Sequence, residues 1–94
     1  MLTEEQLTTF INKGGIDKIG QAAYTLISVL VKMAKEKGYP EELDVSVSEI
    51  MYKAKFRGYT QLKAARDILK KEDVINGYKN VNRGEIGTFF LKYE

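Results

Sequence analysis

The chain of 94 residues is 44% hydrophobic and carries a net charge of +2, which suits one domain with a single modest core. It contains no Cys and no His, so disulfides, thiol nucleophiles, imidazole bases and nearly all transition-metal sites are excluded. Lys and Arg outnumber Asp and Glu by nine to three in residues 51–83, whereas the counts are five to eight in residues 1–50 and one to two in residues 84–94. Either a polyanionic partner or a solvated lysine-rich surface explains this local excess of positive charge.

Two helices are predicted in the first part of the chain. Residues 3–6, Thr-Glu-Glu-Gln, form a capping box, so the first helix begins at Glu4 and ends before Gly14. Its narrow apolar stripe either covers the domain's own core or packs on a second subunit. The second helix, residues 16–37, is apolar over more than half of its circumference and ends at Gly38. Either the first helix or a partner subunit covers its surplus apolar surface.

An acidic connection follows the second helix. The run at residues 41–44 lacks the Gly and the ligand spacing of a calcium loop. We therefore interpret it as a solvated loop, with Asp44–Val45 as a one-pair strand beneath a later hairpin.

Residues 46–72 predict two helices joined by a tight turn. Ser46 to Glu49 form a second capping box, so a helix begins at Val47 and ends at Arg57–Gly58. Thr60 is the expected N-cap of the next helix, which spans residues 61–72 and contains neither Gly nor Pro.

The helix at residues 61–72 has an apolar side and a basic side. Helical spacing places Leu62, Ala65 and Leu69 toward the core. Arg66 lies at the edge of this stripe and is expected to form an internal ion pair. The side chains expected to project outward are Lys63, Ala64, Asp67, Lys70 and Lys71.

The hydrophobic period changes from 3.6 to 2 in residues 74–93. β-Branched and aromatic residues there flank a polar segment at residues 80–84, which predicts a two-stranded β-hairpin with a basic tip. Asn76–Gly77 is a rival turn signal, but a turn there would leave only Val74–Ile75 for the first strand. We therefore place the turn at residues 80–84 and interpret Gly77 as a bulge.

The order of these elements resembles a winged helix-turn-helix domain over residues 16–93. The residues that carry the resemblance are Ile50, Met51, Ala54, Phe56, Leu62, Ala65, Leu69 and Val74–Ile75. Lys55 and Asp73 stand where this family commonly has Gly, and the turn between the helices is one residue longer than usual. The resemblance implies a mostly helical α+β fold in one domain, residues 1–94. Its parts are an N-terminal helix arm (1–15), a long core or dimer helix (16–38), a helix-turn-helix (46–72) and a two-stranded wing (74–93).

The resemblance also implies sequence-specific binding of double-stranded DNA through recognition helix 61–72 and wing residues 79–84. Gln pairs with adenine, Lys with guanine and Asp with cytosine; the candidates near base edges are Thr60, Gln61, Lys63, Ala64 and Asp67. The candidates for phosphate contacts are Lys53, Lys55, Arg57, Lys70 and Lys71. The candidates in the wing are Lys79, Asn80, Asn82 and Arg83. Tyr59 either stacks on a sugar or plugs the turn, and Asp67 alternatively pairs with Lys63 or Lys71.

The small size and the lysine- and tyrosine-rich composition are similar to those of plasmid- and phage-borne proteins that act in replication, plasmid partition or transcription regulation. We expect a homodimer that reads half-sites about 34 Å apart. The alternative is a docking module of the same fold for a motor, filament or replication protein.

The sequence predicts neither catalysis nor a membrane partner. Ser28, Ser46 and Ser48 fall in a helix or its cap without a base to activate them, and Gly14–Gly15 lacks the rest of a phosphate-binding loop. We expect no enzyme activity, no metal and no cofactor. Without a signal peptide or an apolar run of about 18 residues, the expected location is the cytoplasm.

Overall fold

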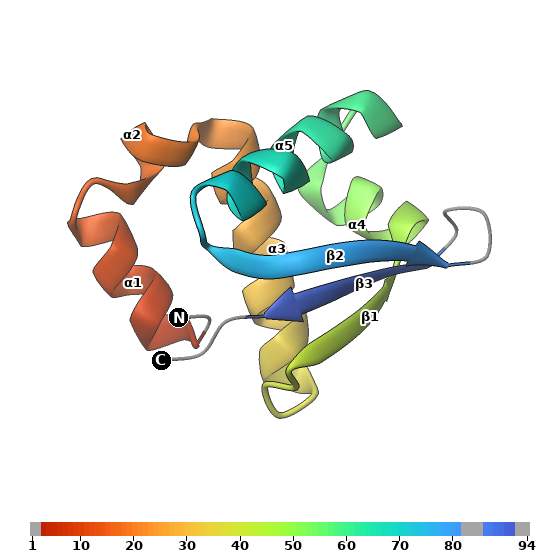
Figure 1. The fold of residues 1–94 in the computed structure, drawn as a ribbon, viewed down its shortest axis with the longest axis horizontal. Coiled ribbons are helices and arrows are strands. Elements are labelled where there is room, and N and C mark those ends of the chain that lie inside the picture. The colour runs from red at the N-terminus through yellow and green to blue at the C-terminus, as the bar shows by residue number, and fades with distance from the viewer. Residues whose placement is uncertain (1–2, 82–85, 92–94) are drawn as a thin grey trace.

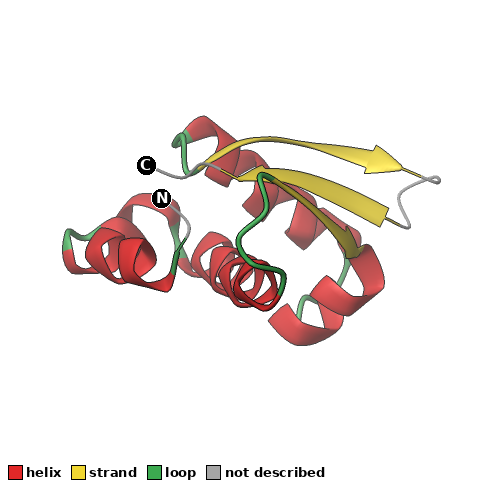
Figure 2. Cartoon of the chain, turned by 90° about the horizontal axis from the view of Figure 1, so that it is seen from below, coloured by secondary structure: helices red, strands yellow, loops and turns green. Residues whose placement is uncertain are grey.

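The computed structural model describes residues 3–81 and 86–91, which form an α+β architecture dominated by helices (Figure 1). In this part of the chain the elements follow in the order α1-α2-α3-β1-α4-α5-β2-β3. The strands form one antiparallel sheet in the order β1-β3-β2. This sheet is one layer of the molecule, and the helices form the other (Figure 2).

Helix α1 (Glu4–Asn12) covers part of the domain's own core. The predicted capping box is confirmed, since the Gln6 backbone N–H donates to Thr3 Oγ1 at 3.1 Å and the Thr3 N–H donates to Gln6 Oε1 at 3.3 Å. Leu7 is buried in the common core, and an exposed ion pair of 3.0 Å joins Glu4 to Lys35 on α3. Of the two predicted roles for this helix, the intramolecular one is therefore observed.

The predicted single helix at residues 16–37 is wrong, because the structure divides it at Gly20. The two parts are α2 (Gly15–Ile19) and α3 (Gln21–Glu36). Gly20 has φ 86° and ψ 166°, a backbone conformation that is essentially restricted to glycine. The chain turns there so that α2 packs beside α1 instead of extending α3 (Figure 1).

Helix α3 lies at the centre of the core and contacts α1, α2, α4 and α5. Its buried side chains are Ala23, Leu26, Ile27, Leu30, Val31, Met33 and Ala34. The helix ends as predicted at Gly38, which has φ 76°, and the Tyr39 N–H donates to the Ala34 carbonyl at 2.7 Å. Because neighbours surround α3 on several sides, most of its wide apolar arc is covered within the chain.

Strand β1 (Glu42–Ser46) is longer than the one-pair strand predicted from the sequence. It pairs with β3 (Ile86–Leu91) from Glu42 opposite Phe90 to Ser46 opposite Ile86. Leu43 and Val45 are buried, and the residues on either side of them are exposed. The sheet therefore has three full strands, with β1 added to the hairpin, because this alternation gives β1 an apolar face to bury against the helices.

Strands β2 (Ile75–Val81) and β3 form the predicted hairpin. Val81 is opposite Ile86, so the connection falls at residues 82–85, outside the described residues, and not at the rival Asn76–Gly77 site. The register shifts between Ile75 and Gly77, so the strand has a bulge with Asn76 as its extra residue, one position before the predicted Gly77. Because of the extra residue, Ile75 and Tyr78 both pack against the core although they are three positions apart.

Helix α4 (Val47–Ala54) begins where predicted but ends earlier. Ser46 Oγ accepts from the Glu49 N–H at 3.4 Å, whereas the Glu49 carboxylate binds Lys53 and not the Ser46 backbone. The predicted end at Arg57–Gly58 is wrong, because Lys55 adopts φ 57° and stops the helix. The next residue, Phe56, is buried and holds the turn against the core.

Helix α5 (Tyr59–Lys71) begins before the predicted N-cap. Gly58 is the N-cap, and Thr60 already lies in the first turn. The Gln61 Oε1 atom accepts from the Arg57 backbone N–H at 3.1 Å. The side-chain amide of the third helical residue thus binds a backbone N–H that lies before the helix. The helix ends at Lys71, and Asp73 follows with φ 60°.

Candidate functional site

The solvent-facing side of α5 carries most of the residues predicted to bind a partner. Leu62, Ala65 and Leu69 are buried, as predicted, and their burial against α3 fixes which side of the helix faces outward. The exposed side chains of α5 are Tyr59, Thr60, Gln61, Lys63, Ala64, Asp67, Ile68, Lys70 and Lys71. The side chains chosen from helical spacing are therefore accessible in the structure.

Five cations define what we call the basic surface: Lys55, Arg57, Lys63, Lys70 and Lys71. The first two are exposed in the α4–α5 turn, and the other three are exposed on α5. Among the described residues, no carboxylate forms an ion pair with any of the five. The basic surface therefore has positive charge available for an external anion.

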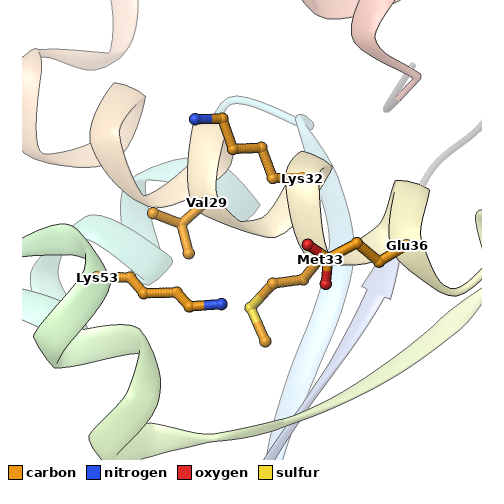
Figure 3. Close-up of a pocket in the computed structure, with 5 residues that line it drawn as sticks. All are labelled: Val29, Lys32, Met33, Glu36 and Lys53. Atoms are coloured by element: carbon orange, nitrogen blue, oxygen red, sulfur yellow. The ribbon is translucent and has the colours of Figure 1, made fainter.

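Lys53 is directed elsewhere. Its Nζ lies 3.0 Å from Glu49 Oε1, and this contact raises the pKa of the Lys53 ammonium group above its usual value. The side chain points toward Met33 of α3 and lines a surface pocket of about 310 Å³, together with Val29, Lys32 and Glu36 (Figure 3). Lys53 is thus engaged with α3 and Glu49, although spacing alone grouped it with the basic surface.

Two predicted base-reading groups already have partners within the chain. Gln61 accepts from the Arg57 N–H, so its carbonyl oxygen supports the start of α5. Asp67 Oδ1 accepts from the Tyr78 hydroxyl of β2 at 2.6 Å. This bond raises the pKa of the Tyr78 phenol, because the protonated hydroxyl is the donor. The sequence suggested Lys63 or Lys71 as the partner of Asp67, but neither forms an ion pair with it.

Arg66 of α5 contacts two aromatic rings, Tyr59 on the same helix and Tyr78 on β2 of the hairpin. Its side chain is buried, and the guanidinium carbon lies 3.9 Å from the Tyr78 ring centroid and 5.5 Å from that of Tyr59. Arg66 Nη1 also donates to the Tyr59 hydroxyl at 3.1 Å. We call these three residues the aromatic clamp. Sequence reasoning missed it; the only hint was an Arg on the buried stripe seven positions after a Tyr, which places the two side chains on one face of α5.

The hairpin contributes one described candidate side chain. Lys79 of β2 is exposed, and its Nζ lies 5.8 Å from the Phe90 ring centroid on β3. The backbone of Asn80 belongs to β2. The side chain of Asn80 and the whole of Asn82 and Arg83 lie outside the described part of the chain.

Within the described residues, no group of three or more acidic side chains is arranged to hold a metal ion. None of the helices in that part of the chain has both the length and the apolar character needed to cross a membrane.

Comparisons of the chain with family models, curated proteins and solved structures found no match.

Proposed function

We propose that the chain is a winged helix-turn-helix domain that binds double-stranded DNA, with α5 as its recognition helix. The observation that carries this proposal is the basic surface, whose five cations are exposed and unpaired with carboxylates among the described residues. Its charges follow one continuous segment, from the turn before α5 to the last residue of that helix. Such a surface suits a row of phosphates better than a single small anion.

The dimensions of α5 fit the major groove. A helix with its side chains is about 10–12 Å in diameter, and the groove is about 12 Å wide. Lys63 lies on the exposed side of the first half of the helix, where it is placed to donate to guanine O6 and N7. Lys55, Arg57, Lys70 and Lys71 lie toward the two ends, where phosphate contacts would set the position of the helix.

Two backbone conformations support the winged-helix assignment. The family commonly has Gly at the positions of Lys55 and Asp73, and both residues have positive φ, at 57° and 60°. The chain thus keeps the left-handed turns that Gly usually provides, although it places other residues there. The β2–β3 hairpin directly follows the second of these turns and would serve as the wing, with Lys79 as its described candidate side chain.

The proposed biological settings are replication, plasmid partition or transcription control, each of which uses small DNA-binding domains. A protein docking module of the same fold is the other candidate. The pocket between α3 and α4 and the exposed Tyr52 ring favour a protein contact on that side of the molecule. The basic surface favours DNA, because a docking module has no need of five cations on one segment that lack a carboxylate partner in the described part of the chain.

Fluorescence anisotropy with random duplex DNA at several salt concentrations tests the DNA-binding proposal. With about four phosphates neutralised, log K is expected to fall with log salt at a slope of about −4. Replacing both Lys70 and Lys71 by Ala is expected to weaken binding and to reduce the slope by about 2.

The matched control removes the same charge from Lys13 and Lys18, which are exposed beside α2. It is expected to bind nearly as well as the wild type. No binding at low salt, or an equal loss in the control, would overturn the proposal and favour the docking module.

A further inference from the structure

We propose that Asp67 is a specificity residue and that Tyr78 positions it. In this proposal, Tyr78 holds the Asp67 carboxylate on the exposed side of α5, so that the domain selects a C·G pair in the major groove and disfavours DNA without it. The inference rests on the proposed DNA-binding function and adds which base pair is selected and how.

Asp67 is the only acidic residue of α5, and it lies among the cations of the basic surface. Lys63 and Lys71 are each four positions away, at the spacing where helical ion pairs form. The carboxylate nevertheless binds the Tyr78 hydroxyl at 2.6 Å and forms no ion pair with either lysine. The fold therefore places this negative charge by a contact between α5 and β2, and leaves the lysines available.

Tyr78 is itself held from two sides. Its backbone pairs with Phe89 in the sheet, and its ring stacks on the buried Arg66 guanidinium at 3.9 Å. A hydroxyl on so constrained a ring fixes the orientation of the carboxylate before any ligand arrives. Preorganisation of this kind lowers the entropy cost of forming a further hydrogen bond.

The Asp67 carboxylate retains the capacity to accept another donor. An ionised carboxylate has about four acceptor positions, and the Tyr78 hydroxyl binds only Oδ1. In the major groove, the cytosine N4 amino group is the donor that Asp or Glu side chains read. Another base pair can present an acceptor at the position of the cytosine amino group. The desolvated carboxylate would then have no donor from the DNA, and it would repel the neighbouring phosphates.

The negative charge should therefore reduce binding to DNA in general and increase discrimination between sequences. The variant Asp67→Asn is nearly isosteric and removes the charge. The variant Tyr78→Phe keeps the ring that stacks on Arg66 and removes only the hydroxyl.

The test begins with selection of the preferred site of the wild-type protein from a randomised duplex library. Anisotropy then measures binding to that site, to a set in which each base pair is replaced in turn, and to random duplex. Asp67→Asn is expected to bind random duplex several-fold more tightly and to lose about 5- to 100-fold discrimination at one C·G pair only. Tyr78→Phe is expected to lose part of the discrimination at the same pair, and the double variant to lose no more than Asp67→Asn.

A purely structural role for Tyr78 would weaken binding to all duplexes equally, and that result would overturn its positioning role. Unchanged discrimination at every pair in Asp67→Asn, or selection of a pair other than C·G by this residue, would overturn the specificity role while DNA binding stood. A wild-type protein that binds no duplex would overturn the DNA-binding proposal itself. Thermal unfolding of each variant verifies that a change in binding does not arise from loss of the fold.

Discussion

At the scale of single residues, Lys55 and Asp73 adopt the left-handed backbone conformation that glycine usually adopts at the end of a helix. Both have left-handed φ values and both end a helix, Lys55 after α4 and Asp73 just beyond α5. A side chain with Cβ costs about 1–2 kcal/mol in this conformation. The exposed Lys55 side chain also belongs to the basic surface. At this position the chain therefore has a lower free energy of unfolding than a glycine would give, and it carries a positive charge beside the start of α5.

Replacing Lys55 by Gly is expected to raise the free energy of unfolding by up to about 1 kcal/mol, since relief of the left-handed strain exceeds the added freedom of the unfolded chain. Lys55→Val is expected to lower it by about 1–2 kcal/mol, because a β-branched side chain tolerates this conformation poorly. Urea unfolding measures both effects. In the anisotropy assay, Lys55→Gly should reduce the salt slope by about 1 despite its greater stability. A less stable Lys55→Gly protein would contradict this account of the turn.

At the scale of elements, Gly20 decides how the N-terminal helices are arranged. The helix breaks directly after Ile19, the last residue of α2, and Ile19 is buried in the core. The same bend places α2 beside α1, and the two together cover part of α3. One backbone conformation thus determines where α1 and α2 lie against α3.

Gly20→Ala is expected to lower the free energy of unfolding by roughly 1–3 kcal/mol, because φ 86° and ψ 166° strain any residue with Cβ. The surroundings do not oppose the methyl group, since no atom lies within 4 Å of the place it would occupy. Urea denaturation followed by circular dichroism measures the loss. Gly58→Ala is the matched control: Gly58 also caps a helix with open space around it, but its φ of −164° is extended backbone. The control should lose less than about 1 kcal/mol, and equal losses at both glycines would argue against strain at Gly20.

At the scale of the whole molecule, the structure changes the basis for expecting a dimer. The apolar arc of α3 suggested spare surface for a second subunit, but α1, α2, α4 and α5 all contact that helix within the chain. The proposed DNA-binding function still favours two copies, because paired half-sites on DNA are read by two copies of a protein. We therefore propose that pairing occurs on DNA and does not precede it.

Light scattering of the free protein at tens of micromolar should give the mass of one chain. A duplex with two preferred sites in inverted repeat, about 34 Å apart, should bind two chains, and a duplex with one site should bind one. Changing the spacing by half a helical turn, which places the sites on opposite faces of the duplex, should abolish any cooperativity between them. A free protein with the mass of two chains would contradict this proposal and show that the dimer forms through a protein interface without DNA.

Features that depend on neighbours in the sequence were determined by the sequence alone. The starts of α1 and α4, the buried stripe of α5, the end of α3 at Gly38 and a bulge next to Gly77 all follow from caps, periodicity or turn residues within a few positions. The exposed cations of α5 belong to the same class, because burial of Leu62, Ala65 and Leu69 leaves them no other side of the helix.

Only the tertiary structure decided the features that join distant segments. These are the bend at Gly20, the full pairing of β1 with β3 more than 40 residues later, the bond from Tyr78 to Asp67 and the aromatic clamp around Arg66. The physical reason is that a strand partner, or the partner of a charged side chain, is chosen from everything the folded chain brings near it. Helical spacing predicted Lys63 or Lys71 as the partner of Asp67, but the packing of β2 against α5 brings the Tyr78 hydroxyl to it.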